Sequence, residues 1–212
     1  MIKYFYNPPG LVKLLFNKWN WTTSNNKVLL TFDDGPIPET TPLILAALDK
    51  LNVRAAFFCV GNNIKKNPSL AKEILSCGHI ICNHTYNHKI ITRLEQTEAE
   101  KEIQSFINLT EDLLNYTPKY FRPPHGKFNL STNKLLTKLN QSVVMWSLLT
   151  CDYKNDLNLV KLAVTKYLQK NSIIVLHDSL KCKDIIIDSI KTVADRVYEK
   201  GFEIGEPDGC LK

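Results

Sequence analysis

Two neighbouring carboxylates stand at the end of an apolar run in residues 29–40, LLTFDDGPIPET. Asp33 and Asp34 are followed at once by Gly35 and Pro36, and Asp, Gly and Pro commonly form surface turns. The functional alternative is a site in which one carboxylate binds a metal ion and the other accepts a proton. Because neighbouring strand residues point to opposite faces, both can serve one site only where the strand breaks, and Gly35-Pro36 predicts such a break.

A histidine pair lies further along the chain, in residues 83–88, NHTYNH. A straight strand would hold His84 and His88 about 13 Å apart, whereas a helical turn would bring their Cβ atoms to about 5–6 Å. We therefore expect a helical turn, which Asn83 could cap; two surface histidines are the alternative. With Asp34, the pair gives two histidines and one carboxylate, a set typical of catalytic zinc. Other divalent ions accept the same ligands, so the pattern alone does not fix the metal.

The elements that must position these side chains alternate along the chain. Apolar runs predict seven strands, at residues 27–32, 54–61, 79–84, 119–124, 142–149, 172–178 and 202–207. Periodic patterns predict helices at about 40–50, 68–76, 95–115, 131–139, 157–169 and 184–199, with Gly78 ending the second and Ser131 capping the fourth. This alternation indicates a parallel α/β fold.

Two α/β architectures fit this pattern, a barrel and a doubly wound open sheet. Polar residues follow five different strands: the Asp33-Asp34 pair, the His84–His88 segment, Arg122, Asp152 and His177. In a barrel the carboxyl ends of all strands meet at one mouth, where active sites are built. An open sheet gathers ligands only near its switch point. Five contributing strands favour the barrel.

The bulk composition narrows the class of protein. The 212 residues suit a single domain, and 44% hydrophobic with 23% charged residues is typical of globular proteins. The net charge of +6 comes from evenly spread lysines, and no basic block interleaved with aromatics predicts nucleic-acid binding. No apolar stretch is long enough to span a bilayer. The sequence does not fix the oligomeric state, and we expect a monomer.

The cysteines and the N-terminal segment suggest a cellular location. Six cysteines without a CxxC pair predict reduced thiols, with Cys182 and Cys210 exposed. Residues 1–26 are expected to form an extension without a clear signal peptide, which predicts a cytoplasmic protein, with unconventional export as the alternative. Leu11, Leu14 and Leu15 share one face of a predicted short helix. We expect that helix to pack on the domain; lying on a membrane is the alternative.

Five segments, in order, resemble the motifs of the polysaccharide deacetylase family, also called the NodB-homology domain or carbohydrate esterase family 4. They are TFDDGP, HTYNH, RPPHG, WSLLTCDY and IIVLHD, and the resemblance spans about residues 27–206. It implies a distorted (β/α)7 barrel in residues 27–212, which agrees with the seven strands counted independently.

The resemblance also implies a role for each matching residue. Asp33 would be the general base, Arg122 would hold it, and His177, tuned by Asp152, would be the general acid. The metal ligands would be Asp34, His84 and His88, with Zn²⁺ the expected ion and Co²⁺, Ni²⁺ or Mn²⁺ the alternatives. Substrate-binding positions would be Pro123, Pro124, His125, Tyr153 and Leu176, the last lining the acetyl-methyl pocket. The chain departs from the family at His125, usually an aromatic residue, and at Tyr153, usually Trp.

The implied activity is metal-dependent removal of acetyl groups from N-acetylated sugars, such as oligo- or polysaccharides containing N-acetylglucosamine. Metal-activated water would attack, Asp33 would take its proton while the Arg122 fork donates it two hydrogen bonds, and His177 would protonate the amine. An O-acetyl esterase for xylan-type sugars and a non-catalytic carbohydrate-binding domain are the alternatives. Taken singly, His177 could be a core histidine and Arg122 a surface ion pair. We assign no catalytic role to Asp178, and His79 is expected to be structural.

Overall fold

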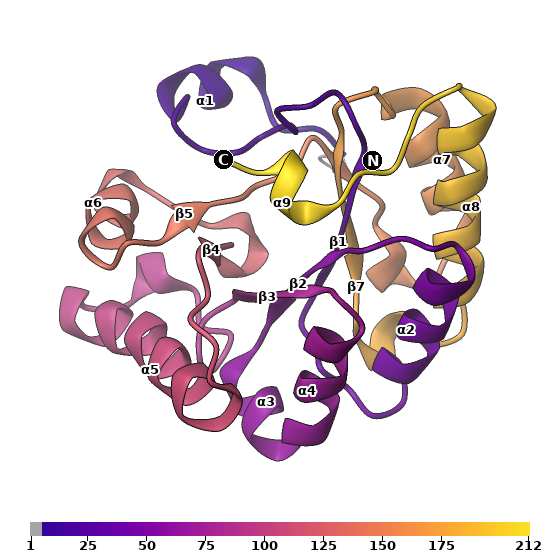
Figure 1. Cartoon of the computed structure of the whole chain (residues 1–212). Helices are drawn as coiled ribbons and strands as arrows, with labels where there is room; N and C mark the ends of the chain where they lie inside the picture. Colours follow the sequence, from indigo (N-terminus) through magenta and orange to yellow (C-terminus); the bar gives the residue numbers. More distant parts are fainter. Residues whose placement is uncertain (1–5) are drawn as a thin grey trace.

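The computed structural model describes residues 6–212, and its centre is one seven-stranded sheet. The strands are β1 (Leu29–Asp33), β2 (Ala56–Cys59), β3 (Ile80–Asn83), β4 (Tyr120–Phe121), β5 (Ser142–Val143), β6 (Leu148–Leu149) and β7 (Ile173–His177). They lie in the order β5-β4-β3-β2-β1-β7-β6, and every pair is parallel. Within residues 6–212 no pairing joins β5 to β6, so the curled sheet is a half-barrel, consistent with the expected distorted (β/α)7 barrel (Figure 1).

Helices fill most of the connections between these strands. They are α1 (Gly10–Leu15), α2 (Thr41–Lys50), α3 (Gly61–Lys66), α4 (Pro68–Ser76), α5 (Gln96–Leu114), α6 (Leu130–Lys138), α7 (Leu157–Tyr167), α8 (Ile186–Glu199) and α9 (Pro207–Cys210). The six predicted helices are confirmed within about two residues at each end, and Gly78 follows α4 with φ of 79°. The N-cap of α6 is Asn129 rather than Ser131, because Asn129 and Thr132 form a reciprocal capping box. The sequence did not predict α3 or α9.

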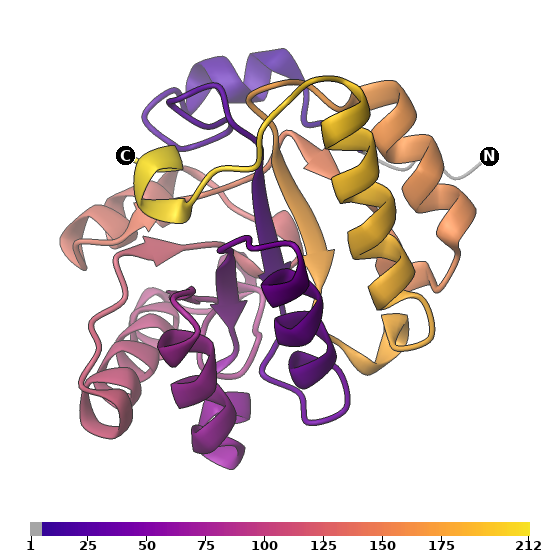
Figure 2. The ribbon, with the colours of Figure 1, turned by 45° about the vertical axis from the view of Figure 1, so that its right-hand side comes forward.

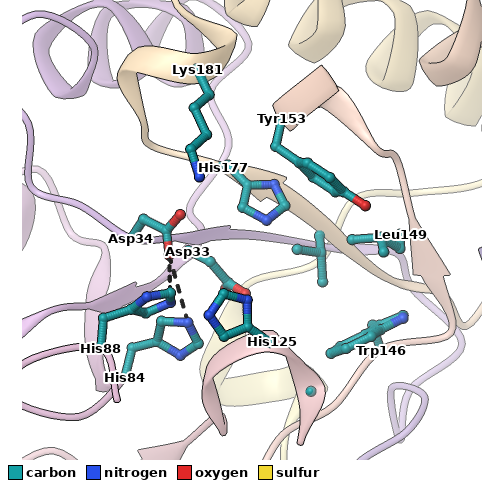
Figure 3. A pocket seen from close by; sticks show the side chains of 12 residues that line it. Asp33, Asp34, His84, His88, His125, Trp146, Leu149, Tyr153, His177 and Lys181 are labelled. Atoms are coloured by element: carbon teal, nitrogen blue, oxygen red, sulfur yellow. Dashed lines mark ion pairs between the residues drawn. The ribbon is translucent and has the colours of Figure 1, made fainter. Parts of the chain in front are cut away.

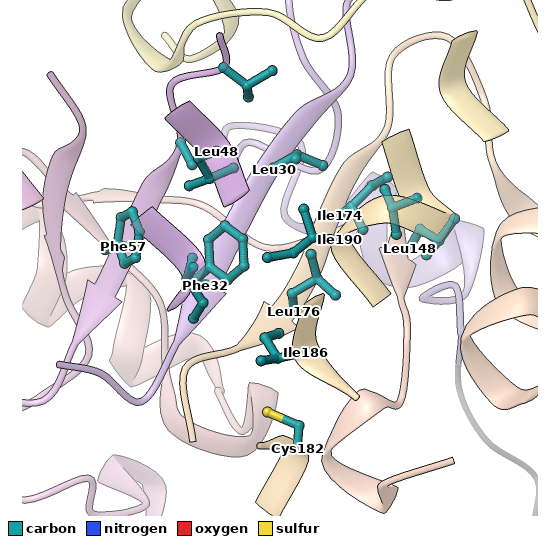
Figure 4. Packing of buried hydrophobic residues seen from close by; sticks show 14 of the residues in the cluster. Leu30, Phe32, Leu48, Phe57, Leu148, Ile174, Leu176, Cys182, Ile186 and Ile190 are labelled. Carbon is teal, nitrogen blue, oxygen red and sulfur yellow. The ribbon is translucent and has the colours of Figure 1, made fainter. Parts of the chain in front are cut away.

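The two faces of the sheet have different partners. Along β1, Leu30 and Phe32 point outward and pack under α2 and α8, together with Leu176 of β7 (Figure 4). Figures 1 and 2 show α2, α8 and α7 side by side over this outer face. Each such buried side chain contributes about 1.5–3 kcal/mol. The alternate residues Leu29 and Asp33 point into the half-barrel, so the strand period itself directs Asp33 toward the interior.

Two strand predictions are corrected. The run 142–149 forms two short strands, because its middle part bonds elsewhere: Val144 bridges to Asn20, and the amide of Met145 donates to the Asn20 carbonyl. Residues 202–207 form no strand and contribute a single bridge from Ile204 to Val28. The expected number of seven strands is therefore right, but two of the runs were assigned incorrectly.

The N-terminal helix packs through a different face from the one predicted. Val12 and Phe16 contact the cluster around Trp19, whereas Leu11, Leu14 and Leu15 are 68–69% exposed. The division into an extension, residues 1–26, and a domain, residues 27–212, stays a prediction. Within the described part of the chain, no helix is long and apolar enough to cross a membrane.

All six cysteines are free thiols, as expected. Cys182 and Cys210 are fully buried, however, so the prediction that they are exposed was wrong. Both lie in hydrophobic clusters, where a thiol packs as a small apolar group.

Candidate active site

Asp33 and His177 occupy matching positions on neighbouring strands. They are register partners at the carboxyl ends of β1 and β7, and both line one cavity of about 330 Å³ (Figure 3). Parallel neighbours lie about 4.8 Å apart, and side chains at matching positions point to the same face. The backbone therefore holds a carboxylate beside an imidazole without help from any loop.

A buried arginine fixes the Asp33 carboxylate. Arg122 is fully buried, and its Nη1 donates to Asp33 Oδ1 at 2.6 Å. Its Nε and Nη2 donate to the carbonyls of Val144 and Met145, and its guanidinium stacks on the Phe58 ring at 3.9 Å. The predicted two-bond contact with Asp33 is thus wrong, because the rest of the fork serves the backbone. The Val144 and Met145 carbonyls lie between β5 and β6. Because they accept hydrogen bonds from Arg122, they do not pair with a neighbouring strand, and strand structure is interrupted there.

His177 is held by a fully buried carboxylate. Its Nδ1 lies 2.7 Å from Asp152 Oδ1, and its backbone N–H donates to Asp152 Oδ2, also at 2.7 Å. Burial by itself would lower the pKa of His177, but the charge and hydrogen bond of Asp152 outweigh burial and raise that pKa to about 9. The ring is therefore an imidazolium at neutral pH, with Nε2 left for the cavity.

Three further side chains form a compact ligand set. Asp34 Oδ1 lies 3.1 Å from His88 Nε2 and 3.7 Å from His84 Nε2, and the ligand atoms of all three residues lie within 4.8 Å of one another. Two ligands of one tetrahedral ion with bonds of 2.0–2.2 Å are about 3.4 Å apart. The set therefore fits a small divalent ion and makes a possible Asp-His-His metal site.

The backbone reaches this arrangement by left-handed turns. Asp34 has φ of 83° and leaves the strand directly after Asp33, so both aspartates face the cavity as predicted. The expected helical turn from His84 to His88 is absent; Thr85 and His88 are left-handed instead, at φ of 66° and 57°. Asn83 does cap this loop, since its side chain accepts from the Thr85 amide.

The protonation states of His84 and Asp34 suit the binding of a cation. His84 Nδ1 donates to the Arg122 carbonyl at 2.7 Å, which leaves Nε2 as the free ligand atom. Burial, the largest cause, lowers the pKa of His84 to about 4, so the ring is neutral and able to ligate at pH 7. Burial would raise the pKa of Asp34, but the hydrogen bond to His88 and the positive charge of His177 hold it well below its usual range.

The remaining predicted residues divide into two groups. His125 and Tyr153 line the cavity, at 4.8 Å between the His125 and His88 ring centroids and 5.0 Å between those of Tyr153 and His177. Pro123 and Pro124 are buried outside the cavity lining. Leu176 is fully buried on the opposite face of β7, so the prediction that it lines the pocket was wrong. His79 is buried and accepts a backbone bond from Ala55, in keeping with a structural role.

Sequence reasoning missed several residues that line the cavity: Gly126, Trp146, Leu149, Val175 and Lys181 (Figure 3). Val175 could have been found, because residues two apart on a strand share a face and His177 was already assigned. Gly126 is a tight fit, since a Cβ there would meet the Trp146 ring. No pattern in the sequence pointed to Lys181, which lies in a short 3₁₀ turn after β7.

Asp178, to which the sequence assigned no role, fastens the loop that carries Asp34. Its carboxylate accepts from the hydroxyls of Thr40 and Thr41, at the start of α2. Burial raises the pKa of Asp178 to about 6, although these hydrogen bonds act against it. The same carboxylate lies against Gly35, where a Cβ would overlap it. The carboxyl ends of β1 and β7 are therefore joined through Asp178.

Comparison with known proteins identifies the family of this chain. The family model described as "Polysaccharide deacetylase" matches residues 20–144, more than half of the chain. The chain belongs to the polysaccharide deacetylase family. This match begins seven residues before the domain start predicted at Lys27.

Two curated relatives illustrate the family. A peptidoglycan-N-acetylglucosamine deacetylase of Bacillus cereus is 41% identical over 128 residues, which are 60% of this chain and 46% of that protein. The peptidoglycan-N-acetylmuramic acid deacetylase PdaC of Bacillus subtilis is 33% identical over 180 residues, 82% of this chain and 38% of PdaC. The chain thus spans less than half the length of these two relatives.

Among solved structures, the Bc1960 peptidoglycan N-acetylglucosamine deacetylase superimposes with a TM-score of 0.88 at 28% identity. The similarity covers 96% of this chain and 97% of that one. The family fold therefore extends over nearly the whole chain.

Proposed function

We propose that the chain is a metal-dependent hydrolase that removes acetyl groups from N-acetylated sugars. One observation carries the proposal: Asp33 and His177 are register partners on adjacent strands, each held by its own buried partner, beside the cluster of Asp34, His84 and His88. A carbohydrate-binding domain would need neither a buried arginine on the carboxylate nor a buried carboxylate on the imidazole. The named activities of the relatives point the same way.

Asp33 is the base in this proposal. Arg122 binds its Oδ1, so Oδ2 is the atom that accepts the proton of the attacking water. Positioned base catalysis of this kind contributes about 10²–10⁴-fold.

His177 is the acid. Its Nδ1 bonds to Asp152, so Nε2 carries the proton that is delivered to the departing amine nitrogen. An amine is a poor leaving group until it is protonated, and a pKa of about 9 keeps the imidazole charged at neutral pH. The acid therefore starts in the protonation state that hydrolysis of an amide requires.

Asp34, His84 and His88 hold the metal in this proposal. A divalent ion bound there supplies a more acidic water and polarises the acetyl carbonyl. His125 lines the cavity, and its backbone N–H would donate to the carbonyl oxygen during attack. Leu149 and Val175 give the apolar wall against which the acetyl methyl rests.

The test is acetate release from N-acetylchitotetraose by protein loaded separately with Zn²⁺, Co²⁺, Ni²⁺ or Mn²⁺. We expect release with at least one ion and none after treatment with a chelator. Acetylxylan, assayed in parallel, separates amide from ester preference. Absence of acetate with every ion and both substrates would refute the proposal.

A second assay examines the acid. His177→Ala should lower kcat/KM on the N-acetyl sugar by about 10²–10⁴-fold. The loss on an aryl acetate should be much smaller, because a phenolate leaves without protonation. Equal losses on both substrates, with an unchanged melting temperature, would show that His177 is not the acid.

A further inference from the structure

A lysine side chain projects into the catalytic cavity. Lys181 lines the cavity, and Figure 3 shows its side chain extending toward Asp34 and His177. Within residues 6–212 its ammonium makes no hydrogen bond and no ion pair. The ammonium therefore faces the space that a substrate would occupy.

The backbone beneath Lys181 is well anchored. Lys181 lies in a short 3₁₀ turn, Leu180–Cys182, directly after β7. Its neighbour Cys182 is fully buried, and the thiol donates to the carbonyls of His177 and Ser179. The Lys181 amide donates to the Ser179 hydroxyl at 3.4 Å. This lysine thus starts from a fixed point beside the acid rather than from a free loop.

The carboxylates around the cavity already have other partners. Asp34 contacts the two histidines, Asp33 contacts Arg122, and Asp152 contacts His177. Further out, Asp178 accepts from Thr40 and Thr41, and Asp184 accepts from Asn155. Among the cavity-lining residues of the described chain, 6–212, Lys181 therefore carries a positive charge that no ion pair balances, and an anionic group on the substrate would balance it.

We propose that Lys181 is a specificity-determining residue that binds a carboxylate of the substrate, so the preferred substrate is an acidic N-acetylated glycan. The carboxylate lies on the sugar that bears the acetamido group or on a group attached to that sugar. A lactyl ether and a uronic acid both present this chemistry. The proposal rests on the proposed deacetylation, since it places the acetamido group between Asp33 and His177.

The experiment compares one glycan with and without its carboxylate. Oligomers of N-acetylglucosamine and N-acetylmuramic acid carry free lactyl carboxylates, and the matched substrate has these converted to amides. With the metal-loaded protein, kcat/KM should be about two- to tenfold higher on the carboxylate form, the range expected for a partly exposed charged contact. The preference should shrink as salt rises from about 0.05 M to about 0.5 M. A uronic-acid-containing N-acetylated oligosaccharide distinguishes the two sources of the carboxylate.

Three variants test whether Lys181 is responsible. Lys181→Gln should bring the ratio of the two substrates close to one, and Lys181→Glu should invert the preference. Lys183→Gln, two residues away, exposed and outside the cavity lining, is the matched control and should keep the wild-type ratio. A wild-type ratio of one, or a Lys181→Gln variant with the wild-type ratio, would overturn the proposal.

Calorimetric binding of the two glycans keeps this test separate from the proposed reaction. If neither glycan releases acetate, the proposed function fails, but tighter binding of the carboxylate form that disappears in Lys181→Gln still supports the role of Lys181. Turnover of both glycans with equal binding and equal rates would leave the deacetylation standing and refute the role of Lys181.

Discussion

The catalytic cavity has two regions with different construction. Its inner wall presents Asp33 and His177 to the cavity, and the buried Arg122 and Asp152 hold them from behind. The four side chains are at most 15% exposed and form two ion pairs. Its outer loops carry Asp34, His88, His125 and Lys181, and there the exposed fraction of the Asp34 and His88 side chains is 27% and 29%.

The difference lies in what holds each region. The inner wall is set by strand register and by buried hydrogen bonds, so each group has one position. The outer loops depend on left-handed residues, at φ of 83° for Asp34, 57° for His88 and 56° for His125. The proton-transfer groups are therefore the less adaptable part of the site, and metal binding and substrate choice depend on the more adaptable part.

The largest expected effect comes from removing both nitrogen ligands, His84 near the inner wall and His88 on an outer loop. The double variant His84→Ala with His88→Ala should lose its metal and its acetate release, because Asp34 alone leaves a single ligand. Elemental analysis of dialysed protein measures the first effect. His125→Asn, which leaves all three ligands in place, serves as the control and should keep its metal. Unchanged metal content in the double variant would disprove the assignment.

The next largest effect is expected from a substitution in the inner wall. Asp33→Asn keeps an oxygen for the Arg122 hydrogen bond but cannot take up a proton, so kcat should fall by about 10²–10⁴-fold. Metal content and melting temperature should stay close to those of the wild type. A near-normal kcat with full metal content would mean that another group acts as the base.

A smaller effect concerns the pair of His177 and Asp152. The acid must be protonated, and its pKa of about 9 predicts that activity declines only above about pH 9. In Asp152→Asn the largest raising influence is lost while Asp33 and Asp34 remain, so this decline should move toward about pH 6.5, with a loss of up to about thirtyfold at pH 8. The pH profile of kcat measures the shift; an unmoved alkaline limb would show that Asp152 does not tune the acid.

The same pKa shift has a consequence for stability. Because the folded-state pKa of His177 is raised from 6.5, its protonation stabilises the fold fully below about pH 6.5, and that contribution disappears as the pH rises through about 9. Denaturant unfolding from pH 6 to 10 should show this loss in the wild type and much less of it in Asp152→Asn.

The smallest effect is expected at an outer-loop side chain. His125→Asn introduces a residue that tolerates the left-handed backbone at this position, so the fold and the bound metal should be kept. Loss of the imidazole should raise KM by about two- to tenfold, the range of one net hydrogen bond or ring contact, with kcat little changed. A large fall in kcat instead would place His125 among the proton-transfer groups and remove the distinction between the two regions.

The fold was predictable where the signals are local. Helix α4 was predicted with the bounds Pro68–Ser76, because a proline starts it and Gly78 stops it within a few residues. The interruption between β5 and β6 was not predictable. It depends on hydrogen bonds from Arg122 and Asn20 to the backbone of residues 143–145, and both residues are distant in the sequence. An apolar run shows that a segment is buried, not which partner its amides and carbonyls find.

The candidate site was also predictable where the signal is local and not where it depends on distant contacts. The types and order of Asp33, Asp34, His84, His88, Arg122, Asp152 and His177 were readable, and the structure brings all seven together. The error at Leu176 came from ignoring strand alternation, which places Val175 rather than Leu176 beside His177. Lys181 had no sequence signal, because its relation to the cavity is created only when the turn after β7 folds back over the strand ends.

The contact between Gly35 and Asp178 limits how this protein can be re-engineered. The carboxylate fills the volume that any side chain at position 35 would need, so the first and last motifs share one steric constraint across 143 residues of sequence. A library that randomises the DDGP loop alone would consist mostly of misfolded members. Productive diversification would have to vary positions 35 and 178 together, trading a larger residue in one for a smaller residue in the other.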